Sequence, residues 1–496
     1  MRKFVLSLLI LAFVMSGCTI KIKAPNLNDN DTGEHIPDDT LTPEAPVNPD
    51  DSEPTIVPEN PEPTVTPENP KTEIDETKLV GSDNDLLRIN IFTNDNSTPT
   101  NQGVYHQGSV TLTEQNPEKI IKESMGMKIK VRGNSTSAPD KKPYKIKFDQ
   151  AQSFFGLEAA KDWILLANYF DKTNIRNYLA YKLANKLDNL DFQPSYIFVD
   201  VYLNNSYQGM YMLTEQIEAN NGRVDIKNHL NSNGISSFLL EADARAVDEY
   251  AGYEDKCYFN VGNYYMTMKY PSADDYIEAL ELNDTTYINE YEKNVLWVRN
   301  FIANVNNAIK SNDYNRIEQY IDVDSFIDYY IVQEFFKNVD VGSTSQYYVI
   351  DQNDSQVRLK CGPVWDFDIS SGVVDNSASD IYTNYTYAEL YVKSVDYFYS
   401  QLLTNQTFLQ KLKSRYKEVR SLLVETIAEI EIIKNDLAKA QNRNLHKWEL
   451  PTQRRYWIEI YAISKTYYNI RTLNGHYNHL TKCLNERLTI LDKYYS

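Results

Sequence analysis

The sequence has few of the residues that build disulfide frameworks or zinc sites. It contains four cysteines and six histidines in 496 residues. After Cys18 the cysteines are isolated, at 257, 361 and 483, and the close histidine pair is His476 with His479. Two histidines three residues apart, without nearby acids or thiols, are far more common as surface residues than as metal ligands. The pattern therefore supports neither a disulfide scaffold nor a zinc protein.

Positive charge is also scarce, since 50 Lys and Arg face 69 Asp and Glu, for a net charge of -19. A nucleic-acid-binding protein needs an excess of basic residues to neutralise phosphates, so no nucleic-acid partner is expected. Much of the imbalance lies in residues 19–78, which hold 15 acidic and 4 basic residues, a net charge of -11. The remainder of the chain is only mildly acidic.

The apolar run at the N-terminus is short. It covers 4–14, follows two basic residues and ends in MSGC at 15–18, with small residues before a cysteine. Such a run is too short to span a membrane comfortably. The segment resembles a bacterial lipobox, which implies a signal peptide over 1–17, lipidation of Cys18 and a membrane-anchored lipoprotein on the outer face of the cell membrane. A plain secretory signal is the alternative.

Aromatic residues are almost absent from residue 24 to about 80, where most of the prolines lie. A nine-residue repeat, EPTIVPENP at 53–61 and EPTVTPENP at 62–70, occupies the middle. Such a segment cannot bury enough apolar surface to offset the entropy of ordering it. We predict an acidic, Pro/Thr/Glu-rich disordered tether over 18–80, which would hold a globular domain away from a membrane.

From Leu86 onward, polar and apolar residues alternate, which predicts strands in LLRINIF, GMKIKV and KPYKIKF. The stretch from Ser195 to Ile217 predicts a hairpin with its turn at 204–206. Between them, DKTNIRNYLAYKLANKL at 171–187 has apolar residues at helical spacing. This first part of the chain, about 81–275, is therefore expected to be rich in β-structure.

After about residue 275 the pattern becomes helical. Helices are predicted over 291–309 and 321–336. Apolar stripes typical of packed helices follow at Phe408, Leu412, Tyr416, Val419, Leu423 and Ile430, and again at Leu480, Leu484, Leu488 and Leu491. The predicted fold class is α+β and two-lobed, with a helix-rich part over about 276–496 and a cleft between the lobes.

The segment from Glu334 to Gly372 carries three acids in polar turns, Asp340, Asp366 and Asp368. If VWDFD at 364–368 is extended, its two carboxylates point to the same side. Like charges this close call for a cation or a shared proton, and a divalent metal with phosphate oxygens is the usual solution. Taken alone, the acid pair is as often a turn cap as a metal site.

Residues 128–149 offer basic groups and a loop suited to anions. The turn RGNST at 132–136 provides a glycine, backbone amides and hydroxyls. On the following strand Lys145 and Lys147 face away from its apolar residues, so one of them could reach a phosphate. Taken alone, this motif is better explained by a solvated strand face. Glu215, at the end of an apolar strand, would position such a lysine or cap a helix.

Six motifs taken in order resemble the CotH family, named for a spore-coat protein kinase. They are RGNSTSAPDKKPYKIKF, DWILLANYFDKTNIRNYLAYKLA, GMYMLTEQIE, FLLEAD, KYPSADD and GPVWDFDIS. The resemblance covers about residue 85 to the C-terminus. It implies an atypical protein-kinase-like fold that binds ATP with Mg²⁺ or Mn²⁺ and phosphorylates Ser or Thr of extracytoplasmic proteins.

The resemblance also implies roles for the acids. Asp340 corresponds to the catalytic acid, which would orient the substrate hydroxyl and accept its proton. Asp366 corresponds to the metal-binding acid, with Asp368 as a second ligand. Such enzymes often place an asparagine after the catalytic acid to hold a second metal, whereas this chain has Ser345 and Gln346 there. Gln346 would supply an amide oxygen, from a longer side chain, which puts activity in more doubt than fold.

For the phosphates, the resemblance favours Lys147 over Lys145, with Lys142 as another candidate and Glu215 as the partner of the lysine. Arg132 is assigned to the same nucleotide site. Arg176 would hold either phosphate or the fold, and the sequence does not separate these roles.

Two other functions stay open. A catalytically weak or inactive module with a structural role in envelope, wall or spore-coat assembly would suit the anchor, the tether and the 38 tyrosines. A glycoside hydrolase would also use paired carboxylates, but it would give the basic motifs no purpose. The expected partners of a kinase are a Ser/Thr-rich protein substrate and, through the anchor, a membrane.

Overall fold

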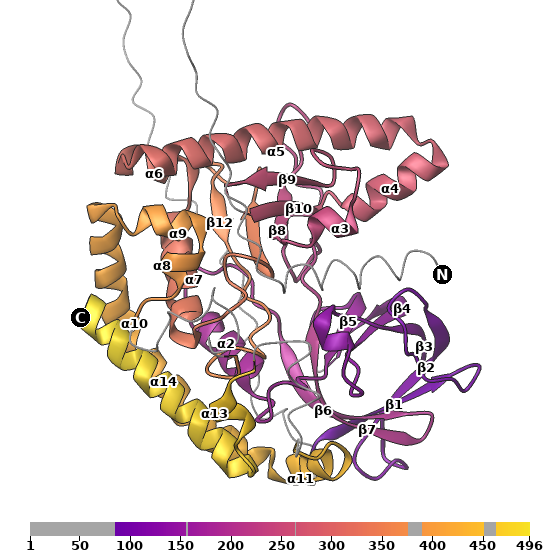
Figure 1. The fold of residues 1–496 in the computed structure, drawn as a ribbon. Coiled ribbons are helices and arrows are strands. Elements are labelled where there is room, and N and C mark those ends of the chain that lie inside the picture. The colour runs from indigo at the N-terminus through magenta and orange to yellow at the C-terminus, as the bar shows by residue number, and fades with distance from the viewer. Residues whose placement is uncertain (1–84, 155–156, 263, 375–388, 451–462) are drawn as a thin grey trace, which may run out of the picture. The chain divides into compact units, whose positions relative to one another are not determined.

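Two β-sheets and a set of packed helices make up the part of the chain that the structure describes (Figure 1). In this computed structural model the described residues are 85–154, 157–262, 264–374, 389–450 and 463–496, all within a unit that spans 71–496. The predicted signal peptide, Cys18 and the tether lie outside the described residues. The mixed α+β class is confirmed.

The first sheet is a closed barrel of seven strands, in the order β1-β2-β3-β4-β5-β7-β6. Neighbours pair antiparallel except β1 and β6, whose parallel pairing closes the barrel. The strands are β1 (Leu87–Thr93), β2 (His106–Thr113), β3 (Ile120–Val131), β4 (Tyr144–Gln152), β5 (Ala160–Leu166), β6 (Tyr196–Leu203) and β7 (Ser206–Glu215). Strand alternation predicts the strands, but closure depends on long-range pairing that no local pattern encodes.

Alternating burial fixes which residues fill the barrel. On β4, Tyr144, Ile146 and Phe148 are buried, as predicted, and the lysines between them face outward. The hairpin of β6 and β7 turns at Asn204 and Asn205, whose φ angles of 48° and 64° are the left-handed values that a tight hairpin turn requires. The predicted hairpin is thus confirmed.

The second sheet has five strands in the order β12-β11-β8-β10-β9. These are β8 (Phe238–Ala242), β9 (Tyr258–Val261), β10 (Tyr264–Tyr270), β11 (Gln346–Ile350) and β12 (Leu359–Cys361). Strands from both sides of residue 275 therefore share one sheet. Because β11 pairs with β8, the turn that precedes β11 and carries Asp340 lies beside the turn that follows β8.

The helices follow the predicted stripes, often with longer bounds. They are α2 (Arg176–Asn185), α3 (Ala246–Glu249), α4 (Ala273–Leu282), α5 (Thr285–Ser311), α6 (Tyr314–Tyr320), α7 (Val323–Phe336), α8 (Val392–Val395), α9 (Tyr397–Leu402), α10 (Gln406–Asp436), α11 (Ala438–Lys447), α13 (Lys465–Tyr468) and α14 (Leu473–Tyr495). Helix α7 is buried along almost its whole length and packs against α2, α10 and α14. No helix in the described ranges combines the length and apolarity needed to cross a membrane.

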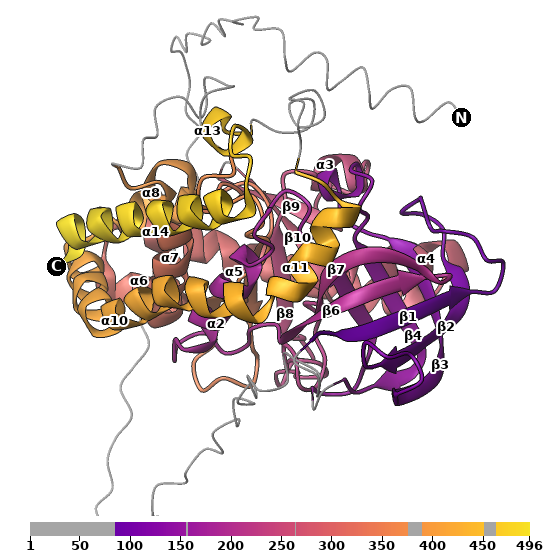
Figure 2. The same ribbon diagram turned by 90° about the horizontal axis from the view of Figure 1, so that it is seen from below.

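Helix α11 lies against the barrel strand β7 (Figure 2). Arg443 on this helix donates to both carboxylate oxygens of Asp85, at 2.6 and 2.7 Å, and to Asp200. Asn444 accepts a hydrogen bond from the backbone N–H of Met210 at 3.1 Å. The C-terminal helices are therefore joined to the barrel at the point where the described chain begins.

Helix α14 buries His476, so the interpretation of this histidine as a surface residue is wrong. His476 is 2% exposed, packs edge-on to Tyr467 with ring centroids 4.6 Å apart, and finds no hydrogen-bond partner for either ring nitrogen within the described residues. Burial, with the positive charges of Arg176, Lys172 and His479, lowers the pKa of His476 from 6.5 to about 3. The fold therefore holds the neutral ring.

We expect this histidine to make the protein sensitive to acid. Because the pKa of His476 is lower in the folded chain, the unfolded chain binds the extra proton first, so stability is complete above pH 6.5 and falls as the pH drops toward 3. At pH 5 the loss amounts to about 2 kcal/mol. Urea unfolding of His476→Phe should show a flatter pH dependence between 6.5 and 5. The control is His446→Gln, at an exposed histidine. The expectation is contradicted if the stability of H476F depends on pH as steeply as that of the wild type, or if H446Q flattens the pH dependence equally.

Candidate active site

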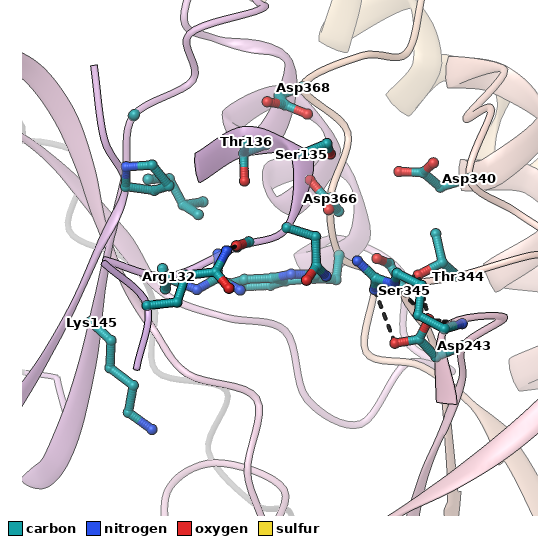
Figure 3. Close-up of a pocket in the computed structure, with 18 of the residues that line it drawn as sticks. Arg132, Ser135, Thr136, Lys145, Asp243, Asp340, Thr344, Ser345, Asp366 and Asp368 are labelled. Atoms are coloured by element: carbon teal, nitrogen blue, oxygen red, sulfur yellow. Dashed lines mark hydrogen bonds and ion pairs between the residues drawn. The ribbon is translucent and has the colours of Figure 1, made fainter. Parts of the chain in front are cut away.

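A pocket of about 710 Å³ gathers charged residues from the barrel and from the second sheet with its turns (Figure 3). The barrel contributes the end of β3, part of β4 and the RGNST turn. The other wall comes from β8 and α3, from the 340–345 turn and from the 365–368 segment. Five residues singled out in the sequence line the pocket together: Arg132, Lys145, Asp340, Asp366 and Asp368.

Asp340 is positioned by the way helix α7 ends. Lys337 takes a left-handed φ of 45° and stops the helix, and a tight turn follows. The carbonyl of Asp340 accepts the backbone N–H groups of Ser343 and Thr344, both at 3.0 Å. Gly342, with a φ of 82°, lies so close to the backbone of Val395 that a larger residue would clash there. The turn is therefore closed on itself, and the Asp340 side chain projects into the pocket.

Asp366 does not lie on a strand, so the extended VWDFD predicted from the sequence is wrong. Residues 362–367 have no regular structure, and Asp366 adopts a left-handed φ of 63°. Non-glycine residues in this conformation carry backbone strain and gather at functional sites. Ser345, with a φ of 58°, faces the same pocket. Asp366 and Asp368 nevertheless both line the pocket.

Two side chains of the α2 region hold the segment that follows Asp366. The Asn177 side-chain oxygen accepts the backbone N–H of Phe367 at 2.7 Å. Arg176 donates to the carbonyls of Ser370 and Ser371, at 3.0 and 3.1 Å, and forms a buried ion pair with Asp171. Arg176 therefore serves the fold of this loop, which the sequence alone left open.

Burial raises the pKa of all three acids. Burial, and then the charge of Asp366, raise the pKa of Asp340 to about 8. Burial followed by the charges of Asp366 and Asp340 raises the pKa of Asp368 well above its usual range. Burial also raises the pKa of Asp366, against the opposing charges of Arg132 and Arg245. This corner of the pocket has more negative charge than its own cations balance.

A divalent metal fits this corner only with help from another ligand. In the described part of the chain, no three Asp, Glu, His or Cys side chains converge closely enough to hold a metal ion by themselves. Mg²⁺ is commonly bound by one or two carboxylates together with substrate phosphates and water. The pair of Asp366 and Asp368 meets that requirement, so these two residues would hold the metal when a phosphate ligand completes its shell.

The RGNST turn forms the opposite wall. Gly133 has a φ of 78°, and a side chain there would run into Thr136, so only glycine fits this turn without strain. Ser135 and Thr136 follow in a short 3₁₀ turn and line the pocket. The guanidinium of Arg132 lies 5.7 Å from the ring centroid of Trp365, which also lines the pocket.

Among the candidate lysines, the structure brings Lys145 to the pocket. Lys145 and Lys147 share the outer face of β4, yet only Lys145 is next to the pocket, because Lys147 lies two residues further along the strand. Both pair with Asp162, at 3.1 and 4.0 Å. Lys142 turns back and donates to the carbonyls of Ser137 and Ala138. The geometry thus favours Lys145 over the sequence-preferred Lys147 and over Lys142.

Glu215 is not placed beside these lysines. Strand β5 separates β4 from β7, and Glu215 is paired across strands with the buried Trp163, on the sheet face opposite to Asp162. Its carboxylate accepts the backbone N–H of Ser195 at 2.9 Å and lies 3.8 Å from Arg223. The acid that pairs with the pocket lysine is therefore Asp162. Alternation along β5 places Asp162 on the outer face of the barrel, so this pattern could have indicated it.

Gln346 also has a different place from the one its sequence position suggested. Its side-chain oxygen accepts the N–H of Gly342 at 2.9 Å, and its side-chain nitrogen donates to Asp396 at 2.7 Å. The residue is 1% exposed and outside the pocket lining, where Ser345 stands instead. The amide braces the Asp340 turn rather than facing a metal.

The sequence interpretation missed a second group of pocket residues beyond β8. Glu241, Asp243 and Arg245 line the wall opposite Arg132, with Thr344 beside them. Asp243 is the last residue of the FLLEAD motif, to which the sequence alone gave no role. Arg245 lies two positions after it, and this nearby pair of opposite charges could have indicated the second group of pocket residues.

Comparison with known families decides the relationship of the chain. Residues 129–491 match the family described as CotH kinase protein. The chain belongs to this family. The matched range includes every residue that the pocket draws from β3 onward. A comparison with curated proteins found no match.

Membership in the CotH family suggests a kinase-like phosphotransferase related to spore coat. The match starts inside β3, whereas the CotH barrel here also needs β1 and β2, which pair with β3 and β6. A folded CotH domain in this chain therefore begins before residue 129.

Proposed function

We propose that this CotH protein is an ATP- and metal-dependent protein kinase that phosphorylates Ser or Thr on extracytoplasmic, spore or envelope proteins. The observation that carries the proposal is the meeting of Asp340, Asp366 and Asp368 with Arg132 and Lys145 in one pocket. Clustered acids with raised pKa opposite fixed cations are what phosphoryl transfer needs, since its catalysis is mostly positioning and charge stabilisation.

In the proposed reaction Asp340 acts on the acceptor. Its carboxylate orients the hydroxyl of a Ser or Thr and takes up its proton. The hydroxyl oxygen forms the new bond to the γ-phosphorus while the bond from that phosphorus to the β–γ bridging oxygen breaks, and ADP leaves with the electron pair. A pKa of Asp340 raised to about 8 suits a group that accepts a proton near neutral pH.

Other residues of the chain bind and orient the phosphates. Arg132 and Lys145 offer fixed cationic donors from the barrel, and the RGNST turn offers hydroxyls and backbone N–H groups. Asp366 and Asp368 would hold the metal, which would supply positive charge to offset that of the phosphates. The barrel and the second sheet with α7 would then act as the two lobes of a kinase-like arrangement around the nucleotide.

The surface location rests on the sequence before residue 85. The lipobox-like segment ending at Cys18 and the acidic repeat that follows support a lipid-anchored enzyme that acts on the outer face of the cell membrane. A protein substrate rich in Ser or Thr would then be reached through the tether.

One observation favours a second candidate, a weak or inactive kinase-like module with a binding role. The amide of Gln346 is engaged with Gly342 and Asp396, so this position supplies no second amide ligand of the kind kinases use. This alternative predicts that a role in envelope or coat assembly persists when Asp340 is replaced.

Substitution of Asp366 tests the proposed metal site. In the full-length protein we expect Asp366→Asn to weaken Mg·ATP binding about tenfold or more, because it removes a carboxylate ligand and halves the charge offered to the metal. Isothermal titration calorimetry with ATP, with and without Mg²⁺, measures this directly.

The control for that titration is Asp492→Asn, which changes an acid paired with Arg420 on the outer helices. It should bind Mg·ATP as the wild type does. Failure of the wild type to bind ATP in the presence of Mg²⁺ or Mn²⁺ rejects the kinase proposal. Equal binding by D366N and wild type rejects the assignment of Asp366.

A further inference from the structure

Arg245 joins three segments around the pocket. Its Nε and one terminal nitrogen donate to the two carboxylate oxygens of Asp243, at 2.8 and 2.9 Å. The same terminal nitrogen donates to Thr344 Oγ1 at 2.8 Å. The guanidinium also contacts the side-chain amide of Asn134, and turning the amide oxygen toward it satisfies both groups. One side chain thus links the β8–α3 connection, the Asp340 turn and the RGNST turn.

Asp243 anchors one edge of the Arg245 guanidinium, and the other edge faces the pocket. Asp243 is 8% exposed and also accepts the backbone N–H of Arg245 at 2.9 Å, whereas the Arg245 side chain is 41% exposed. A bidentate pair with a buried carboxylate fixes the plane of a guanidinium. In Figure 3, Asp243 and Thr344 lie on the same side of the pocket as Asp340. Arg245 is therefore a pre-oriented cation beside the candidate catalytic acid.

Arg245 shares the pocket with the acids. Asp340 and Asp366 line the same pocket as Arg245, and Thr344, which Arg245 contacts, belongs to the turn that carries Asp340. Arg245 is thus close to the residue that would bind the metal and to the residue that would receive the proton, which is where the transferred group must pass.

We propose that Arg245 is a catalytic residue that contacts the phosphoryl group during transfer, and that phosphate oxygens replace Asn134 as partners of its outward edge. The inference rests on the proposed kinase function and adds a specific residue to it. Arg245 exchanges no proton, so the bonds made and broken are those given above. Its role is to donate hydrogen bonds to phosphoryl oxygens whose charge changes most in the transition state.

The test compares Arg245→Gln with Arg420→Gln in the full-length protein. Arg420 is a matched control, because its Nε and a terminal nitrogen donate to Asp492 at 2.6 and 2.7 Å, its side chain is 43% exposed, and it lies outside the pocket lining. We expect R245Q to lower turnover at saturating ATP about hundredfold and R420Q to keep the wild-type rate. Wild-type turnover in R245Q overturns the inference.

A binding measurement separates catalysis from structure. Mg·ADP with fluoroaluminate imitates the planar phosphoryl group, and calorimetry should show that the wild type binds it more tightly than Mg·ADP alone. We expect R245Q to lose most of this gain while its affinity for Mg·ADP stays close to that of the wild type. Should R245Q not fold, Arg245→Lys, which keeps the charge and loses the planar fork, replaces it in the same comparison.

The outcomes also separate this inference from the proposal on which it rests. An equal fluoroaluminate gain in the wild type and in the Arg245 variant overturns the role of Arg245 and leaves the kinase function standing. Absence of Mg-nucleotide binding or of phosphate transfer in the wild type itself overturns the kinase function, and the inference with it.

Discussion

Asp340→Asn is expected to lower the rate of phosphate transfer about 10³-fold while Mg·ATP binding is retained. The amide keeps the size of the side chain and its place after helix α7, but it cannot accept the proton of the substrate hydroxyl. In the proposed site other residues, chiefly Arg132, Lys145 and Asp366, would contact the nucleotide, so affinity for Mg·ATP should change little.

Two measurements on the same preparation check this expectation. Transfer of labelled γ-phosphate to a Ser-rich protein reports turnover, and calorimetry reports binding of Mg·ATP. A D340N protein that transfers phosphate at the wild-type rate would show that Asp340 is not the base. A cellular assembly function that D340N leaves intact would instead favour the non-enzymatic alternative.

Arg487→Met is expected to destabilise the fold by about 3–5 kcal/mol. Arg487 on α14 and Glu334 on α7 form an ion pair in which both side chains are 0% exposed. The carboxylate of Glu334 also accepts the backbone N–H groups of Tyr391 and Val392, at 2.6 and 2.7 Å. Loss of the arginine leaves a buried negative charge without its cation, which costs far more than the pair itself contributes.

Urea unfolding measures the change, with two comparisons. The double variant R487M/E334Q removes the stranded charge, so it should recover a large part of the loss. Arg420→Met breaks a half-exposed pair with Asp492, between α10 and α14, and should cost about 1 kcal/mol or less. Equal costs for R487M and R420M would show that burial does not set the strength of these pairs.

Local periodicity was enough to place most elements. The β4 strand and the β6–β7 hairpin follow from alternation, and the stripes from Phe408 and from Leu480 became the buried faces of α10 and α14. Helix α5 ran longer than predicted, from Asp284 as N-cap to Asn312 as C-cap, because the caps and not the apolar stripe set its ends.

Closure of the barrel and the mixing of strands across residue 275 did not follow from the sequence. Both depend on which strand pairs with which over long separations, as in the parallel pairing of β1 with β6 and the insertion of β11 beside β8. Strand order also explains the misplaced partner of the pocket lysine. Because the sequence does not show that β5 lies between β4 and β7, it could not decide whether Glu215 or Asp162 is the partner of the pocket lysine.

The sequence pattern identified the acids of the pocket but predicted the wrong backbone conformation for Asp366 and Asp368. Alternation on a strand put Asp366 and Asp368 together, and the structure brings them together through a left-handed residue instead. Strain of this kind is imposed by the surroundings. Here Asn177 accepts a hydrogen bond from the loop and Arg176 donates to it, and both residues lie far from the loop in the sequence. Arg245 was missed for a related reason, since its role depends on a turn that β11 brings beside β8.

The attachment of α11 to the start of the barrel has a mechanical consequence. For a protein held at a surface through the residues before 85, tension would enter at Asp85, where Arg443 grips both carboxylate oxygens. Strand β1, which follows, is paired on both edges, with β2 and β6. In the anchored enzyme proposed above, the tether would therefore join the domain at this ion pair and at a strand that is hydrogen-bonded on both edges.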